Sequence, residues 1–136
     1  MRMSKGIRNN NPFNIRYNNF NHWKGLIGQD KDGFCIFYSM DFGLRAGIVL
    51  LRTYIKRYHL TDVSSIIKRF APPSENNTHN YISFVRSELS FNSYDPDDIE
   101  FGTFSFCQLV CAICMYESWY RISVEEVNNI IHKFNL

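Results

Sequence analysis

A glutamate ends an apolar helical stripe in the stretch "AICMYESWY", residues 112–120. Counted back from Glu117, the apolar residues Ile113, Val110 and Phe106 lie at spacings of four, seven and eleven, so all four share one face of a predicted α-helix. A carboxyl group held in a partly desolvated cleft has a raised pKa and can act as a general acid. Glu117 is therefore a candidate catalytic acid.

Two structural roles account for the same glutamate. Glu117 can lie at a helix end that water reaches, or it can pair with an arginine such as Arg121 or Arg16. The spacing alone favours these structural roles over catalysis.

The residues before position 39 predict loops and a β-hairpin. Residues 6–33 are rich in Asn and Gly, which favour turns. Within the run "HWKGLIGQDKDGFCIFYS", we expect strands over Trp23–Ile27 and Phe34–Tyr38. The turn between them, Asp30–Gly33, ends in the Asp-Gly pair that hairpins prefer.

Helical periodicity follows. Five helices are expected, beginning at Ser39, Thr61, Thr78, Phe104 and Ser123, with a polar connection over residues 90–103. The fourth, about Phe104–Ser118, carries Glu117. The predicted fold class is α+β and mainly α: a small N-terminal β-hairpin lobe plus about five helices, in a single domain over residues 1–136.

Composition limits the classes of function. The 136 residues are 45% hydrophobic, ample for one core, and a net charge of +2 is too weak to argue for nucleic acid. The start of the chain has no apolar signal segment, and the stretch "FCQLVCAICMY" is too short to span a bilayer. We therefore expect a chain made in the cytoplasm that does not span a membrane.

Three cysteines, Cys107, Cys111 and Cys114, have the spacing of a one-sided helical metal cluster. They are interleaved with apolar residues and have few other ligand types nearby, so we expect buried, reduced thiols, with no metal and no cofactor.

The "IxxxE-S" ending of the predicted fourth helix resembles the catalytic helix of the lysozyme-like superfamily, which includes lytic transglycosylases. Independently, "RNNNPFNIR…WKG" followed by "FYSMDFGLRAGIVLL" is similar to the segment after the catalytic glutamate in peptidoglycan glucosaminidases. Glu117 follows that segment here, whereas the glutamate precedes it in those enzymes. A circularly permuted lysozyme-like domain would reconcile the two matches by placing the Glu117 helix beside the N-terminal loop.

Nearly the whole chain, including "APPSENNTxxYI", also resembles small phage- or prophage-encoded proteins, some called structural protein P5. The resemblances together imply an enzyme that cleaves peptidoglycan glycan strands. Its class would be muramidase, glucosaminidase or lytic transglycosylase, as in an antibacterial phage endolysin. Such an enzyme would act at the bacterial cell wall or periplasm after release or delivery, with a phage or secretion apparatus as a candidate partner.

Glycosidic cleavage needs a protonated acid at the leaving oxygen and a group that manages positive charge at the sugar carbon. We expect Glu117 to be the acid, beside an apolar wall of Ile113, Trp119 and Tyr120. Asp30 and Asp32 are the candidates for a second catalytic carboxylate, although the Asp-Lys-Asp-Gly sequence also suits an ordinary turn. Without them, Glu117 would serve as acid and then base while a sugar hydroxyl attacks.

The resemblance also implies a set of residues that bind the glycan: Asn11, Asn14, Arg16, Trp23, Asn77 and Tyr81. Each has a structural alternative. The asparagines can bond only their own backbone, Trp23 can anchor the hairpin to the core, and Tyr81 is in phase with core positions.

Two other classes of protein compete with the enzyme. One is a noncatalytic virion or injection-apparatus protein that keeps the fold and binds glycan or another subunit. The other is a nucleic-acid binder that uses scattered basic residues, among them Arg45, Arg52 and Lys56 on one helical face; Asp41 and Asp62 dilute that patch, so we expect no nucleic-acid partner.

Overall fold

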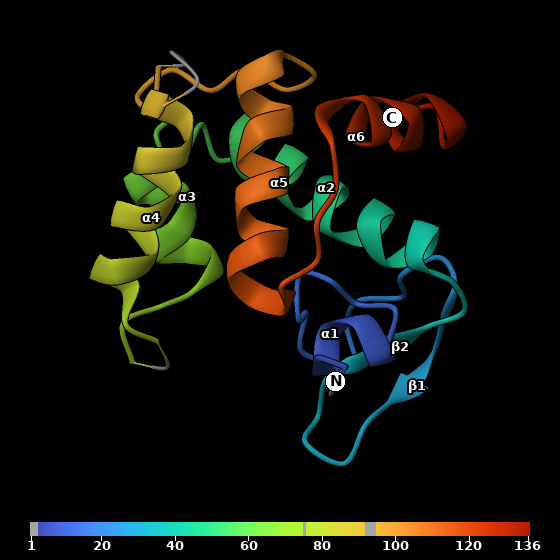
Figure 1. Cartoon of the computed structure of the whole chain (residues 1–136). Helices are drawn as coiled ribbons and strands as arrows, with labels where there is room; N and C mark the ends of the chain where they lie inside the picture. Colours follow the sequence, from blue (N-terminus) through green and yellow to red (C-terminus); the bar gives the residue numbers. More distant parts are fainter. Residues whose placement is uncertain (1–2, 75, 92–94) are drawn as a thin grey trace.

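A β-hairpin and its flanking loops lie against one end of a group of helices in the computed structural model, which describes residues 3–74, 76–91 and 95–136 (Figure 1). Within these residues the fold is mainly α with a small β part, as the sequence predicts. The helices are α1 (Lys5–Arg8), α2 (Met40–Lys56), α3 (Val63–Phe70), α4 (Thr78–Phe91), α5 (Phe104–Ser118) and α6 (Val124–Lys133); the strands are β1 (Leu26–Gln29) and β2 (Cys35–Phe37).

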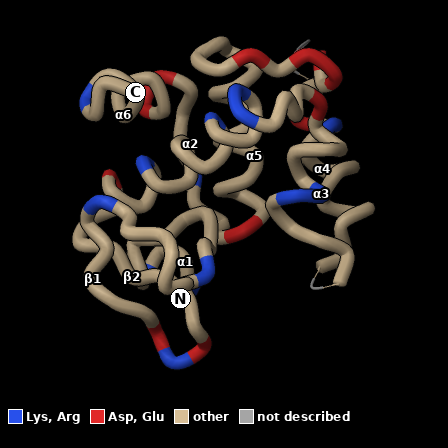
Figure 2. Tube along the Cα trace, turned by 180° about the vertical axis from the view of Figure 1, so that it is seen from behind, with Lys and Arg blue, Asp and Glu red and all other residues tan. Residues whose placement is uncertain are grey.

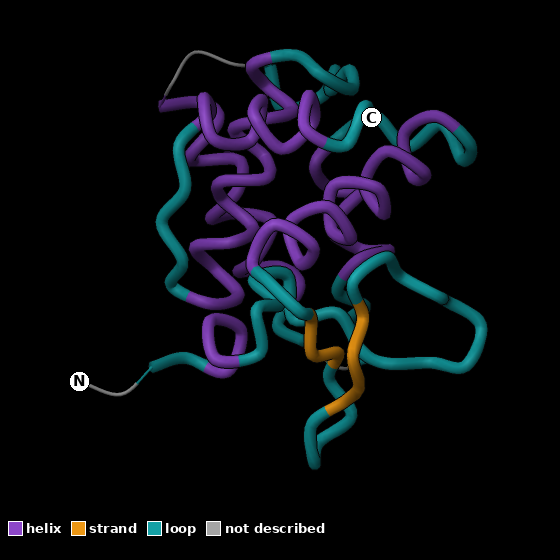
Figure 3. Tube along the Cα trace, turned by 90° about the vertical axis from the view of Figure 1, so that its right-hand side faces the viewer, coloured by secondary structure: helices purple, strands orange, loops and turns teal. Residues whose placement is uncertain are grey.

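The hairpin is antiparallel, with Leu26 opposite Phe37 and Gln29 opposite Cys35, and it projects from one end of the helices (Figure 3). The first strand begins later than the predicted Trp23, because residues 23–26 form a turn closed by a bond from the Leu26 amide to the Trp23 carbonyl, 3.1 Å. Gly25 makes this turn at φ +77°, a left-handed backbone that glycine favours.

Helix α2 runs behind α5 in Figure 1 and carries the N-terminal segment on its buried side. A methyl group at Gly43 would overlap the Asn10 carbonyl, and one at Gly47 would overlap the Phe13 ring. These two glycines let residues 10–13 lie directly against the helix, which fixes the loop that follows. The predicted stripe of α2, which includes Leu44 and Ile48, is buried.

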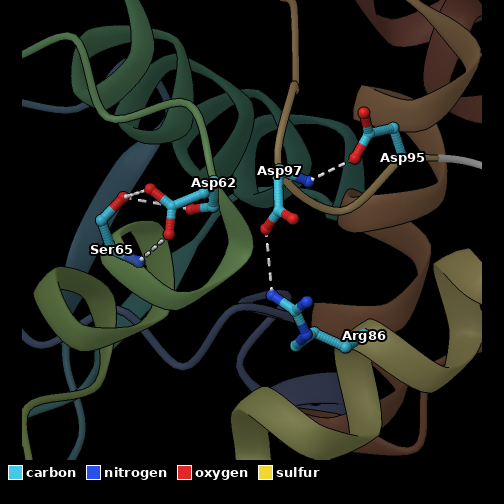
Figure 4. Close-up of polar contacts among 5 residues, drawn as sticks. All are labelled: Asp62, Ser65, Arg86, Asp95 and Asp97. Atoms are coloured by element: carbon cyan, nitrogen blue, oxygen red, sulfur yellow. Dashed lines mark hydrogen bonds and ion pairs between the residues drawn. The ribbon is translucent and has the colours of Figure 1, made fainter.

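Polar capping residues mark the N-terminal ends of α3 and α6. Asp62, one residue after the predicted Thr61, caps α3 by accepting from the Ser65 amide at 3.1 Å (Figure 4). Ser123 caps α6 as predicted, accepting from the Glu126 amide at 3.1 Å. The predicted 90–103 connection begins too early, because residues 90 and 91 still belong to α4. The structure describes the connection from residue 95 onward, where an Arg86–Asp97 ion pair of 3.1 Å ties it to α4 (Figure 4).

Helix α5 packs against α4 on one side and α6 on the other. Its predicted apolar stripe, Phe106, Val110 and Ile113, is completely buried. The buried apolar residues form one cluster that extends from Phe13 to Ile130. The C-terminal end of α5 lies beside the N-terminal segment (Figure 1). Glu117 and Ser118 are the last two residues of α5.

Candidate active site

A cleft of about 250 Å³ opens at the end of α5. Its lining residues come from the N-terminal loop, the hairpin, helices α2, α3 and α5, and the segment between α3 and α4: Phe13, Asn14, Ile15, Arg16, Phe34, Leu50, Phe70, Ala71, Asn76 and Glu117. Among the described residues of this lining, Glu117 is the one carboxylate and Arg16 the one cation. The cleft therefore combines an apolar wall with one carboxyl group, one cation and two amides.

Asn14 holds Glu117 in place. The Asn14 side-chain amide donates to the Glu117 main-chain carbonyl at 3.0 Å and to its carboxylate Oε1 at 3.3 Å. Asn14 adopts a left-handed backbone, φ 51°, which asparagine tolerates better than most residues. One side chain of the N-terminal loop thus fixes both the helix end and the direction of the acid.

The residue after Glu117 secures the same junction. The buried Ser118 hydroxyl donates to the Pro12 carbonyl at 2.8 Å, and the Ser4 hydroxyl donates to the Ser118 carbonyl at 2.7 Å. A methyl group at Gly6 would overlap the Ser118 hydroxyl. The expected placement of the N-terminal loop beside the Glu117 helix is confirmed, and Gly6 permits it.

Burial raises the pKa of Glu117 above its ordinary value of 4.5 because desolvation penalises the charged form. The Tyr81 hydroxyl and the Asn14 amide favour the carboxylate and oppose part of this rise. The net direction favours a protonated side chain, the form that a general acid requires.

Tyr81 lies behind the cleft and not on its surface. Its ring is 1% exposed, stacks on Tyr116 at 3.9 Å and meets Phe70 edge-on at 6.5 Å. The hydroxyl interacts electrostatically with Glu117 but makes no hydrogen bond of ordinary geometry in the described structure. Tyr81 therefore affects the pKa of Glu117. The direct glycan contact that the resemblance implied would require this buried ring to move.

The residues expected to form the apolar wall beside Glu117, namely Ile113, Trp119 and Tyr120, do not line the cleft. Trp119 terminates α5 in a left-handed conformation, φ 54°, and is 81% exposed. Ile113 lies in the core, and Tyr120 lines a different hollow beside α6. Helical spacing could not predict that the backbone leaves the helix at residue 119. The apolar surface beside Glu117 is supplied instead by Phe13, Ile15, Leu50 and Phe70.

The two hairpin acids lie outside the cleft lining. The Asp30 carboxylate accepts from the Phe34 and Asp32 amides, each at 2.9 Å, and from the Asn9 side chain at 2.9 Å. The Phe34 bond is the main cause that lowers the pKa of Asp30. Asp32 is exposed and lies 3.9 Å from Lys5. Asp30 thus shapes the turn, the alternative that the sequence left open, whereas the Asp32 carboxylate contacts Lys5.

Three of the predicted glycan-binding residues take structural positions. Asn11 is completely buried and bonds the Ile15 and Cys35 carbonyls, each at 3.0 Å. Trp23 packs against the core, and Asn77 caps α4 by accepting from the Asn80 amide at 3.2 Å. Of the six predicted residues, the structure brings Asn14 and Arg16 to the cleft with Glu117.

Sequence reasoning missed the residues that form the rest of the cleft, notably Phe13, Phe70 and Asn76. Phe13 and Phe70 meet edge-on at 6.1 Å although they are far apart in the chain. Only the "NNNPFNIR" motif, which contains Phe13, gave a signal for this part of the site.

The described residues contain no group of three or more His, Cys, Asp or Glu side chains that could hold a metal ion. Cys107 and Cys114 are buried and Cys111 is partly exposed, all as free thiols. Within the described ranges, no helix has the length and apolar character needed to cross a membrane. Lys and Arg are distributed over the hairpin and several helices, while acidic residues gather before α5 (Figure 2).

Comparison with known proteins gives one informative similarity. No family model matches the chain. The chain is 42% identical over 88 residues to Protein P5 of Pseudoalteromonas phage PM2, a match that covers 62% of this chain and 55% of Protein P5. The match therefore spans about half the length of that relative. The resemblance to a phage protein called P5 is thus supported for part of the chain.

Proposed function

We propose that this protein cleaves the glycan strands of peptidoglycan, with Glu117 as the general acid. The observation that carries the proposal is the position of Glu117: a half-buried acid of raised pKa that lines a cleft at the end of a buried helix. Two features support a role for Glu117 other than stabilising the fold. Among the described residues Glu117 has no ion-pair partner, and its orientation is fixed by Asn14.

The proposed reaction begins when the protonated Glu117 carboxyl group donates its proton to the glycosidic oxygen. The bond between that oxygen and the sugar anomeric carbon breaks, and positive charge develops on the sugar ring. The resulting Glu117 carboxylate then accepts a proton from the nucleophile as the new bond to the anomeric carbon forms. The apolar wall formed by Phe13 and Phe70 limits water around the acid and keeps its pKa raised.

The nucleophile that suits this cleft is a hydroxyl of the substrate. The described cleft lining supplies one carboxylate, while Asp30 is bonded to the turn amides and Asp32 lies beside Lys5, both outside that lining. In the lytic transglycosylase route, the C6 hydroxyl of muramic acid attacks its own anomeric carbon, Glu117 takes the hydroxyl proton, and a 1,6-anhydro ring results. This route requires no second carboxylate and consumes no water molecule, so we favour it over hydrolysis.

The proposal also includes a relationship of this fold to the lysozyme-like superfamily. A single lysozyme-like domain over residues 1–136, circularly permuted, would place a late glutamate helix beside an early Asn-rich loop. The bonds from Asn14 to Glu117 and from Ser118 to Pro12 support that arrangement. The similarity to a phage protein is consistent with a phage-associated partner, and delivery to the cell wall by such a partner is part of the proposal.

A digestion of purified sacculi tests this function. The intact chain should release soluble muropeptides that end in 1,6-anhydromuramic acid, identified by a mass 18 Da below that of the hydrated product (the mass of one water). Reducing ends in place of anhydro ends would support cleavage by hydrolysis and overturn the transglycosylase route. Sacculi left intact, at a concentration where a known muramidase dissolves them, would contradict cleavage altogether.

A noncatalytic phage protein is the second candidate, favoured by the similarity to Protein P5. Such a protein would use the Asn14–Arg16 side of the cleft to bind glycan without cleaving it. Retention of the chain on sacculi, without release of soluble fragments, would identify this alternative.

A further inference from the structure

Arg16 brings a positive charge to the wall of the cleft. Its guanidinium lies 4.5 Å from the centre of the Phe34 ring, and residues 16 and 34 also pair through their backbones as an isolated antiparallel bridge. Both residues line the cleft together with Glu117. The guanidinium therefore rests on the Phe34 ring of the hairpin, while Arg16 as a whole stays exposed.

The donors of this guanidinium have no acceptor in the described part of the chain. The ion pairs found there join Lys5 to Asp32, Arg86 to Asp97 and Lys133 to Asp41, and none involves Arg16. Lys5, the other cation on the Phe34 ring, lies 3.8 Å from its centre and approaches Asp32. Arg16 thus differs from its neighbour in having its charge available to a ligand in the cleft.

We infer that Arg16 recognises a carboxylate on the substrate, so that the cleft selects acidic glycans over neutral ones. A guanidinium offers paired donors that match the two oxygens of a carboxylate. Glu117 cannot bind the carboxylate of an acidic ligand, because the ionised Glu117 side chain would repel it. The inference rests on the proposed function, within which the carboxylate belongs to muramic acid, either on its lactyl group or on the attached peptide.

The two sources of the carboxylate can be separated with defined oligosaccharides. The first probe is a peptide-free oligomer of N-acetylglucosamine and N-acetylmuramic acid with free lactyl carboxylates. The second is the same oligomer with those groups converted to carboxamides, and the third carries stem peptides. Binding is measured by titration with Glu117→Gln protein, so that no probe is cleaved.

We expect the charged oligomers to bind about 5- to 30-fold more tightly than the carboxamide form, a range set by one charge-assisted bond pair at an exposed site. A preference confined to the third probe would place the carboxylate on the peptide. Arg16→Gln should remove the preference, and Arg16→Lys should keep part of it. Lys31→Gln, which removes an exposed hairpin charge outside the cleft lining, should leave it unchanged.

Equal binding of charged and neutral oligomers by the Arg16-containing protein would overturn the inference, as would an undiminished preference in Arg16→Gln. Preferential binding of the charged oligomers without cleavage by the unmodified chain would instead contradict the proposed enzyme and support carboxylate recognition. Failure to bind any of the three probes would overturn both.

Discussion

Asn14 and Glu117, which are 103 positions apart, are joined by two hydrogen bonds from one side-chain amide. One bond reaches the main-chain carbonyl at the end of α5 and the other reaches the carboxylate. The pair connects the N-terminal loop to the candidate acid, so changes in the loop should alter the behaviour of Glu117.

Asn14→Gly tests that connection. Glycine tolerates the left-handed backbone at this position but removes the amide that favours the charged form of Glu117. The pKa of Glu117 should therefore rise further. Because the protonated acid is the active form, the decline of turnover at high pH should move to higher pH. The maximum turnover should fall by about 10- to 100-fold because the acid is less well oriented. An unchanged pH profile would argue against this connection.

Tyr81→Phe separates the hydroxyl from the ring. The buried hydroxyl makes no hydrogen bond of ordinary geometry in the described structure, so its removal should leave the free energy of unfolding unchanged or raise it by up to about 1 kcal/mol. The high-pH decline of turnover should again move upward, because the hydroxyl favours the Glu117 carboxylate. Tyr81→Ala is the contrasting variant: it empties a fully buried, stacked site and should cost about 3–5 kcal/mol. A large loss of stability in Tyr81→Phe would show that the hydroxyl has a structural partner.

The hairpin acids should affect stability and not chemistry. Asp30→Asn weakens the acceptor of two turn amides, so the thermal midpoint should fall while turnover of the folded protein stays nearly constant. The pKa of Asp30 is lowered in the fold, so its contribution is present above its ordinary value of 3.8 and is lost as the pH falls through the lowered pKa. The two proteins should therefore converge in stability in acid. Asp32→Asn should change little in either respect. A strong loss of turnover in either variant would restore a second catalytic carboxylate.

Gly6→Ala should loosen the junction below the cleft. The added methyl group would overlap the Ser118 hydroxyl and lie 2.9 Å from the Asn11 carbonyl oxygen. We expect a loss of about 1–3 kcal/mol in the free energy of unfolding, as for other overpacked sites. Gly28→Ala is the matched control, because no atom lies within 4 Å of its added methyl group. Denaturant titration of the two variants should separate them, and equal stabilities would count against the tight junction.

The sequence predicted α2 to α6 from their apolar periods, and polar residues marked several of the helix starts, although Ser39 makes no side-chain cap bond to α2. Helix α5 and its buried stripe were predicted from spacing alone, and Ser123 was identified as a cap from the capping box. Helix α1 was missed because four residues are too short to show a period. The hairpin was predicted, but its first strand is Leu26–Gln29 and not Trp23–Ile27, because residues 23–26 form a turn at Gly25.

The site was less predictable than the fold. Glu117 stood out because a carboxylate interrupts an apolar pattern, and Asn14 and Arg16 were found only through a motif resemblance. The apolar wall depends on Phe13 and Phe70, which are brought together by tertiary packing that no local pattern encodes. Trp119 was misassigned because a helical projection fails at a left-handed helix end.

The role of Glu117 is tested most directly by Glu117→Gln, with peptidoglycan turnover and thermal midpoint measured on the same preparation. Glutamine keeps the acceptor for Asn14 but cannot supply the proton, so turnover should fall by about 10²–10⁴-fold. The pKa of Glu117 is raised in the fold, so its contribution to stability is greatest below its ordinary value of 4.5 and declines as the pH rises through the raised pKa. At neutral pH the variant should therefore be as stable as the parent or more so. Undiminished turnover would contradict catalysis by Glu117, and a loss of about 3–5 kcal/mol in stability would identify Glu117 as a structural ion-pair partner instead.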